Sequence, residues 1–559
     1  MVRPFASVIL LAALLGAPAV AGPARAETPN VVLITVDALR PDRLGSMGYW
    51  KPLTPTLDSL ASSGTMFTNA FANSAWTSAS LVSCLTGRHE PAHGVDTREK
   101  SLSRAVATLA GVLADAGYHA PDICYLVGSP NYQNLRFHDF PQKQEFLTTG
   151  HDILFRWLDD YATSNQPFFL YYHFRDLHQP YNPSPPFDSL FMPQDVPRDP
   201  ATQERIATVR NALLLPEGKL SFAATDTGWV RGLYDGQVAE ADSLFFQPLF
   251  HRFRSLGIDS NTVVIISADH GEELLEHGNI GHASTSLTST LYDEELRIPL
   301  IVSWPQGLQG GQRSKDLVQL VDIMPTVLDL VGVPIPEGVQ GRSLTPLLKG
   351  MPLPPQPVFV SSVLGGYQAT AQMQGIRLRA VRTDRWKLVR RDEAAASTRQ
   401  LFHIESDPME LSECSALHPG MADSLEGLLE SWLARCRSLY RAPLWAHDSR
   451  DQGPAVRPVI ISPQPGDSLA FAASDGRLGV RLNAEGRGDM NIEYVVGEGT
   501  YRVEGAIPSE PDGVLFGPFT PTFWNTLSHY NPWAFRVVPA GHPDLATPWV
   551  TFFVKPCDL

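Results

Sequence analysis

Carboxylates and imidazoles closely follow three short apolar runs of this sequence. Asp37 comes directly after the first run, the segment 173–178 with two histidines follows the second, and Asp269 and His270 follow the third. Because ligands in open α/β sheets bind beyond the carboxyl ends of strands, we expect these side chains to meet at one sheet edge. Mixed oxygen and imidazole donors suit a hard or borderline divalent cation. The pattern therefore predicts a metal site.

The elements that must position these groups are predicted from hydrophobic patterning. The short apolar runs are typical of buried, mostly parallel strands rather than alternating half-exposed ones. Helical spacing lies between them, with Leu102, Val106, Leu109 and Leu113 on one face and a second pattern over 153–161. Strands that alternate with helices predict an α/β domain with a mostly parallel sheet flanked by helices. The four predicted strands are residues 31–36, 168–172, 262–266 and 298–302.

The chain is predicted to continue into two smaller units. A subdomain over 351–442 is indicated by a strand-turn-strand at 380–389, a strand at 401–404 and a helix at 421–440. Short strands at even intervals over 455–559, without helices, predict an appended β-sandwich-like domain. The main α/β domain is then expected over 27–350.

The first 26 residues are predicted to be a signal peptide. Arg3 precedes an apolar run at 8–15, and small residues lead to Ala24-Arg25-Ala26, a typical cleavage pattern. We expect an exported, periplasmic or secreted protein without an integral membrane span. Export permits disulfides, and Cys414 with Cys436 is the one pair considered.

Composition narrows the function classes. The chain has 44 Lys and Arg against 59 Asp and Glu, a net charge of −15. A surface that wraps a polyanion is therefore not expected, and nucleic acid is excluded as the leading partner.

Six ordered blocks of this sequence resemble the sulfatase family of the alkaline phosphatase superfamily. The resemblance covers about residues 29–440 and implies an alkaline phosphatase/sulfatase-like fold. The blocks are the segments 30–45, 54–61, 80–88, 269–272, 291–302 and 380–388.

The family's signature places the nucleophile by spacing. Counting back from Leu85-Thr86-Gly87 puts the nucleophile at Thr77, with Ala79 in place of the signature Pro and Leu81 in place of its Arg. Sulfatases carry a Cys or Ser there that is converted to formylglycine, and Thr77 cannot be converted in that way. Cys84 also begins a C-x-x-x-R pattern, but it lies seven residues downstream and lacks the Pro.

The resemblance implies that Asp37, Asp269 and His270 hold one divalent metal ion, calcium, manganese or zinc, with Thr77 as a further ligand. Metal bound to the Thr77 hydroxyl would lower its pKa and produce a nucleophilic alkoxide. The nucleophile position also begins a helix, where backbone amides favour anionic oxygens.

Two histidines are candidate contacts to the substrate. His178 matches the family's H-x-P-Y histidine, and His282 stands where many sulfatases have Lys; each would donate a proton or bind an oxygen. Ala38 replaces the second Asp of the usual pair, and no K-W-H-x-G block follows Gly117. No D-x-x-x-H segment indicates a second zinc site, so one metal is expected.

These observations predict an exported hydrolase that cleaves a phosphate-type ester, a diester or phosphonate monoester, through Thr77. The substrate would be a small molecule or a glycan or lipid ester. A true sulfate esterase on the same fold is the main alternative. A transferase to a surface glycan or lipid and a non-catalytic binding protein stay open.

Overall fold

The computed structural model describes residues 28–123, 130–140, 151–161, 164, 166–194, 199–370, 372–394 and 396–440, and beyond these residues 547 and 549 and the strands between 460 and 555. The predicted signal peptide, Cys124 and Cys557 lie outside the described residues. Among the helices of the described part, none is long and apolar enough to cross a membrane.

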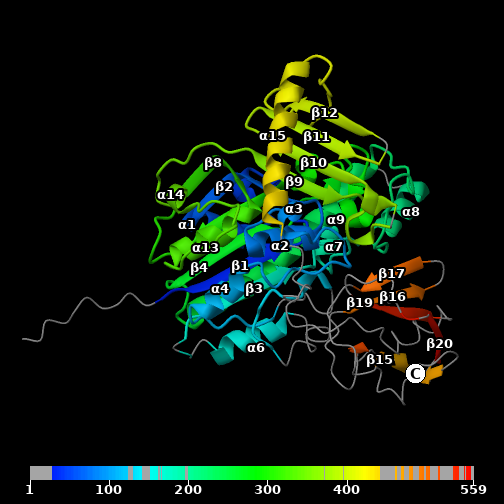
Figure 1. The fold of residues 1–559 in the computed structure, drawn as a ribbon. Coiled ribbons are helices and arrows are strands. Elements are labelled where there is room, and N and C mark those ends of the chain that lie inside the picture. The colour runs from blue at the N-terminus through cyan, green and yellow to red at the C-terminus, as the bar shows by residue number, and fades with distance from the viewer. Residues whose placement is uncertain are drawn as a thin grey trace, which may run out of the picture.

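A six-stranded sheet forms the centre of the molecule (Figure 1). Five strands run in one direction and only β7 (Arg297–Ser303) opposes its neighbours. The predicted mostly parallel sheet is confirmed. In spatial order the strands are β3 (Phe169–Phe174), β1 (Asn30–Val36), β4 (Thr262–Ala268), β7 (Arg297–Ser303), β2 (Thr65–Phe71) and β8 (Gln312–Gln319).

The direction of β7 differs from the prediction, because the run at 298–302 was expected to be parallel. After β4 the chain stays at the carboxyl edge of the sheet, where the backbone N–H of Gly271 donates to the carbonyl of Glu295. No crossover carries the chain to the opposite edge before Arg297, so β7 must run back. Strands β2 and β8 were not predicted; the first half of β8 is polar and only partly buried.

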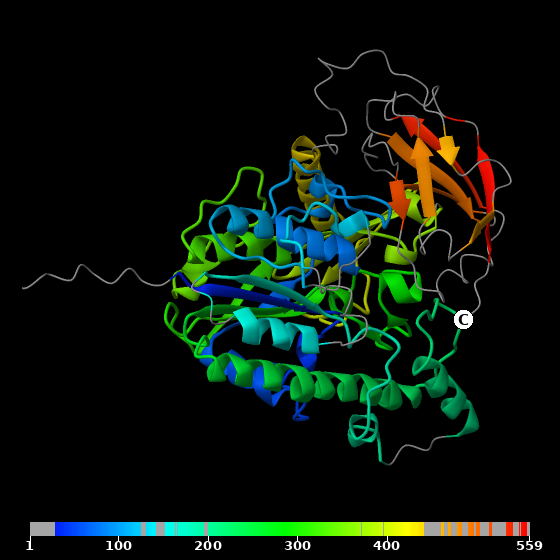
Figure 2. The same ribbon diagram turned by 90° about the horizontal axis from the view of Figure 1, so that it is seen from below.

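Helices cover both faces of the sheet (Figure 2). The continuous apolar runs follow from this cover, and Val31, Val32, Leu33 and Ile34 are fully buried. One face carries α1 (Pro55–Ser63), α9 (Asp226–Ala241) and α10 (Gln247–Ser255); the other carries α2 (Thr77–Thr86), α4 (Leu109–Asp115) and α13 (Ile323–Leu330).

Two helix predictions have different outcomes. Helix α6 (Asp152–Tyr161) forms where the second pattern predicted it. The pattern from Leu102 to Leu113 yields a helix only from Leu109, because the Thr108 side chain accepts the Gly111 N–H and caps the helix there. Leu102 and Val106 are nevertheless buried in the preceding non-helical segment.

A second, antiparallel sheet follows the main domain. Its order is β12 (Ser397–His403), β11 (Trp386–Asp392), β10 (Arg377–Arg382) and β9 (Val358–Val363), which confirms the predicted strand-turn-strand. Helix α15 (Pro419–Leu439) packs on it through Leu425, Leu429, Trp432 and Leu433. Figure 1 shows this helix beside β9–β12.

The proposed disulfide is wrong, since Cys414 and Cys436 are both free. Cys414 Sγ lies 3.2 Å from the carbonyl of Leu401, whereas Cys436 Sγ accepts from the Gln340 side chain. The two thiols thus have separate partners.

The described strands of the C-terminal part form two further sheets. They agree with the short strands that the sequence predicted over 455–559. One contains β13 (Ile460–Ser462), β15 (Leu478–Leu482) and β18 (Val514–Phe516). The other contains β14 (Ser468–Ala470), β20 (Val550–Lys555), β19 (Trp533–Pro539), β16 (Met490–Val496) and β17 (Gly499–Val503).

Candidate active site

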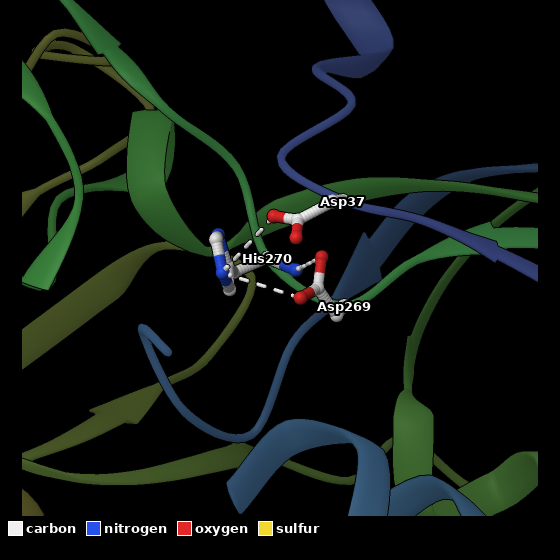
Figure 3. Close-up of side chains that lie close together, drawn as sticks. All are labelled: Asp37, Asp269 and His270. Carbon is white, nitrogen blue, oxygen red and sulfur yellow. Dashed lines mark hydrogen bonds and ion pairs between the residues drawn. The ribbon is translucent and has the colours of Figure 1, made fainter. Parts of the chain in front are cut away.

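The register of β1 and β4 brings two carboxylates together. Val36 pairs with Ala268, so the residues that follow, Asp37 and Asp269, leave the sheet side by side. His270 comes next on the β4 side, and Figure 3 shows the three side chains converging. Their donor atoms, one from each residue, lie within 4.8 Å of one another. The structure thus brings together the three residues that the sequence predicted to bind metal.

The donor set fits a cation. Nε2 of His270 lies 3.3 Å from Asp269 Oδ2 and 3.9 Å from Asp37 Oδ1. Those two carboxylate oxygens are buried and have no hydrogen-bond partner among the described residues. Buried charges without partners are costly, and a divalent ion is what such oxygens and an imidazole bind. The observed site therefore suits the predicted metal.

The His270 ring is oriented for this role. Its Nδ1 donates to the carbonyl of Gly271 at 2.8 Å, which leaves the Nε2 lone pair toward the two carboxylates. Metal-binding histidines are usually held in this way by their other ring nitrogen.

The charges of the cluster stabilise one another. Burial would raise the pKa of Asp37, but the nearby His178, His173 and His270 together hold it well below its usual range. Burial would likewise lower the pKa of His270, and the carboxylates of Asp269 and Asp37 raise it instead. The isolated cluster thus favours ionised carboxylates, the form that binds metal, together with a protonated His270, whose Nε2 would give up this proton when an ion binds.

Thr77 is the first residue of helix α2, and its hydroxyl reaches the cluster. Oγ1 lies 3.3 Å from His270 Nε2. The next residue, Ser78, bonds the Tyr132 hydroxyl at 3.0 Å through its own side chain. The N-terminus of α2 therefore faces the cluster, where its free amides favour an anion.

The other signature positions lie in the core. Ala79 and Leu81 are fully buried, and Leu81 presents no cation where the family signature has Arg. Cys84 is also fully buried, and burial raises the pKa of its thiol far above the usual value. A thiol in this setting behaves as a small apolar group.

Ala38 contributes through its backbone. Its N–H donates to Asp269 Oδ1 at 3.1 Å, and its carbonyl accepts the Tyr234 hydroxyl. Its φ of 58° lies in the left-handed region, which turns the chain away from the end of β1. Position 38, where the resemblance implied a second Asp, thus supplies a backbone amide that orients Asp269.

Both predicted histidines lie beside the cluster. The His282 ring centroid is 4.2 Å from that of His270 and 5.0 Å from that of His178. His178 follows β3, and its Nδ1 donates to the carbonyl of Gln179 at 2.6 Å. His282 immediately precedes α11 (Ala283–Ser286). The structure therefore brings all six predicted side chains to one centre.

Two further residues of the centre were given no role from the sequence. Glu272, fully buried, contacts His282 Nδ1 at 3.2 Å, and His173 lies 3.4 Å from Asp37 Oδ2. The position of Glu272 in the D-H-G-E block could have indicated the first, but not its partner. His173 lies within β3 itself, paired with Thr35 of β1, and its Nδ1 is 3.0 Å from the Thr35 hydroxyl.

Comparison with known proteins agrees with the resemblance to sulfatases that the sequence blocks indicated. A family model described as Sulfatase matches residues 29–333, and one described as N-sulphoglucosamine sulphohydrolase, C-terminal, matches residues 288–433. Arylsulfatase K of Bos taurus is 31% identical over 208 residues, and that of Homo sapiens 30% over 212 residues. Each match covers 36% of this chain and 36% of the relative, so only about a third of those proteins is spanned.

Solved structures share the fold at lower identity. The phosphonate monoester hydrolase of Agrobacterium radiobacter has a TM-score of 0.59 and 22% identity, over 74% of this chain and 97% of that one. A protein solved in complex with its substrate D-glucosamine-2-N,6-O-disulfate has a TM-score of 0.58 and 20% identity, over 74% of this chain and 99% of that one.

Proposed function

Because the chain belongs to the sulfatase family, we propose that it is a metal-dependent hydrolase that cleaves a phosphate-type ester through Thr77. The observation that carries the proposal is the Thr77 hydroxyl, 3.3 Å from His270 within the Asp37–Asp269–His270 cluster. A bound divalent ion would lower the pKa of this hydroxyl and offset negative charge on the substrate. Among the candidate ions, the imidazole donor favours manganese or zinc over calcium.

The residues around the cluster have distinct proposed tasks. Asp37, Asp269 and His270 hold the ion, and Thr77 attacks the phosphorus atom. Amides at the start of α2 bind the non-bridging oxygens, and His178 contacts the departing oxygen. This complete donor set favours a catalyst over a protein that only binds.

The charge of the site favours a monoanionic substrate. The signature Arg position is the buried Leu81, and the sequence lacks the block that supplies a Lys. Arg40 is buried nearby, but its guanidinium is already bonded to Asp42 and Glu276. A phosphodiester or a phosphonate monoester carries one negative charge and needs less compensation than a phosphomonoester dianion.

Sulfate esters are the second candidate. They are also monoanionic, and a solved structure with the same fold holds a sulfated glucosamine. We favour the phosphate type because Thr77 is not a formylglycine precursor.

A substrate panel tests the proposal. Purified protein is loaded separately with calcium, manganese or zinc and assayed on an aryl phosphodiester, phosphonate monoester, phosphomonoester and sulfate with the same leaving group. We expect the diester or phosphonate to be fastest, by about an order of magnitude over the sulfate. Thr77→Ala protein, purified in parallel, measures contaminating activity. Fastest turnover of the sulfate overturns the phosphate assignment.

We also propose that the protein is exported, on the basis of the signal-like segment 1–26. Mass spectrometry of the mature N-terminus from the producing cell tests this; an intact Met1 would contradict it.

A further inference from the structure

His282 and Glu272 form a buried pair next to the cluster. Both side chains are fully buried, and His282 Nδ1 lies 3.2 and 3.3 Å from the two Glu272 carboxylate oxygens. The carboxylate form of Glu272 only accepts, so in that form the proton of this hydrogen bond lies on Nδ1. The other nitrogen, Nε2, is buried without a hydrogen-bond partner in the described part of the chain. An unpartnered buried nitrogen marks a place for a water or ligand.

The pair is held rigidly on both sides. The Glu272 backbone N–H donates to the carbonyl of Glu294 at 2.8 Å, and its carbonyl accepts from Arg40 at 2.9 Å. The His282 N–H donates to Thr285 Oγ1 at 3.0 Å. A carboxylate that fixes an imidazole by Nδ1 is the arrangement that orients a general base.

A Thr nucleophile creates a need for such a base. Attack by Thr77 leaves the transferred group as an ester on Oγ1, and this ester is released only when a second nucleophile attacks. Water is that nucleophile in a hydrolase, and it attacks faster when a positioned base takes its proton.

We propose that His282 is the general base that activates water for hydrolysis of the Thr77 ester, and that Glu272 is its positioning residue. This inference rests on the proposed function. Nε2 takes a proton from water as the water oxygen bonds to phosphorus. The bond between phosphorus and Thr77 Oγ1 breaks with its electron pair on Oγ1, which takes up a proton from solvent, and Nε2–H releases the proton of the water to solvent. The carboxylate of Glu272 stabilises the imidazolium between these transfers.

The neighbouring histidines fit this task less well. Nε2 of His270 faces the two carboxylates of the cluster. Nδ1 of His178 donates to a backbone carbonyl, which carries no net charge to stabilise an imidazolium. His282 alone among the three has a carboxylate on its Nδ1.

Two variants separate the formation of the Thr77 ester from its hydrolysis. Glu272→Gln removes the negative charge beside His282, and His282→Asn keeps an amide donor toward Glu272 while it removes Nε2. We expect each to release about one leaving group per site in a rapid burst and then to turn over about 10²- to 10⁴-fold more slowly than the wild type. Intact-mass spectrometry after an acid quench should show the transferred group on Thr77. Metal content should be unchanged.

Glu273→Gln is the matched control. Glu273 is also buried, but its side chain accepts from Thr290 at 2.7 Å, away from His282. It should show wild-type kinetics and no adduct.

The outcomes are distinguishable. Variants that lose the burst and the steady rate equally, or that turn over normally, overturn the role of the pair. If Glu272→Gln does not fold, His282→Asn gives the same readout. Wild-type protein that releases no leaving group from any ester of the panel contradicts the proposed function itself.

Discussion

Asp37 and Asp269 lie side by side directly after two adjacent parallel strands, because the last residues of these strands, Val36 and Ala268, are paired. The backbone hydrogen bonds of the sheet therefore preorganise the two carboxylates before any ion binds.

Asp269→Asn should lower metal occupancy. The amide is neutral and cannot replace the charge that Oδ2 offers to a cation. Purified protein should hold about one divalent ion per chain, measured by elemental analysis, and the variant clearly less. Asp176→Asn is the control, since this carboxylate is 65% exposed and outside the cluster. Full occupancy in Asp269→Asn would refute the ligand assignment.

Thr77→Ala should abolish turnover and leave the fold and the metal largely intact. Removing the attacking oxygen should cost about 10³-fold or more in rate. Thr77→Ser, which keeps a hydroxyl, should retain measurable activity. Cys84→Ala should change the rate little, because Cys84 is buried in the core. An essential Cys84 with a dispensable Thr77 would show that the signature is aligned incorrectly.

Lys387→Met should destabilise the protein, and more so at higher pH. Lys387 is fully buried, and its Nζ lies 2.8 Å from both Asp293 and Glu410. Removal of one member of a buried ion pair costs about 3–5 kcal/mol of the free energy of unfolding. Burial raises the pKa of Glu410 from 4.5 to about 7, although Lys387 opposes this.

The sign of the pH effect follows from that shift. The folded state holds the Glu410 proton more tightly, so this group contributes most stability below about pH 4.5 and loses it as the pH rises through about 7. Without Lys387 the charged Glu410 loses its ion pair and Asp293 keeps only Arg382, 3.4 Å away, so the loss in Lys387→Met should be larger at pH 8 than at pH 5. Urea unfolding at both pH values measures it, with the exposed Lys349→Met as control. Equal losses at both pH values would argue against this coupling.

Trp432→Ala should weaken the packing of α15 on the second sheet. The indole is 2% exposed, and its ring centroid lies 5.1 Å from that of Phe359 in a stacked arrangement. Truncation of a buried aromatic costs about 3–5 kcal/mol. Leu428→Ala on the same helix is the control, because Leu428 is 42% exposed and should cost far less. Thermal unfolding of both variants measures the difference; similar losses would place the core contact elsewhere.

The sequence by itself determined the strands that carry the site and the residues at their ends. The runs before Asp37 and Asp269 are mostly apolar, with hydroxyl side chains at Thr35, Thr262 and Ser267, because helices cover both faces of the sheet. This pattern can be recognised in the local sequence. The spacing of the signature also placed Thr77 at a helix start, and the structure has α2 begin there.

Only the tertiary structure decided the direction of β7 and the side-chain pairs between residues that are distant in the sequence. The antiparallel course of β7 follows from the path between Ala268 and Arg297, which no periodicity encodes. The pairing of Glu272 with His282 joins residues ten positions apart across the β5 (Glu273–Leu274) and β6 (Ile280–Gly281) hairpin. Lys387 and Asp293, 94 positions apart, form a buried pair only because the second sheet packs there. Such contacts arise from the packing of whole elements, so they could be found only in the folded chain.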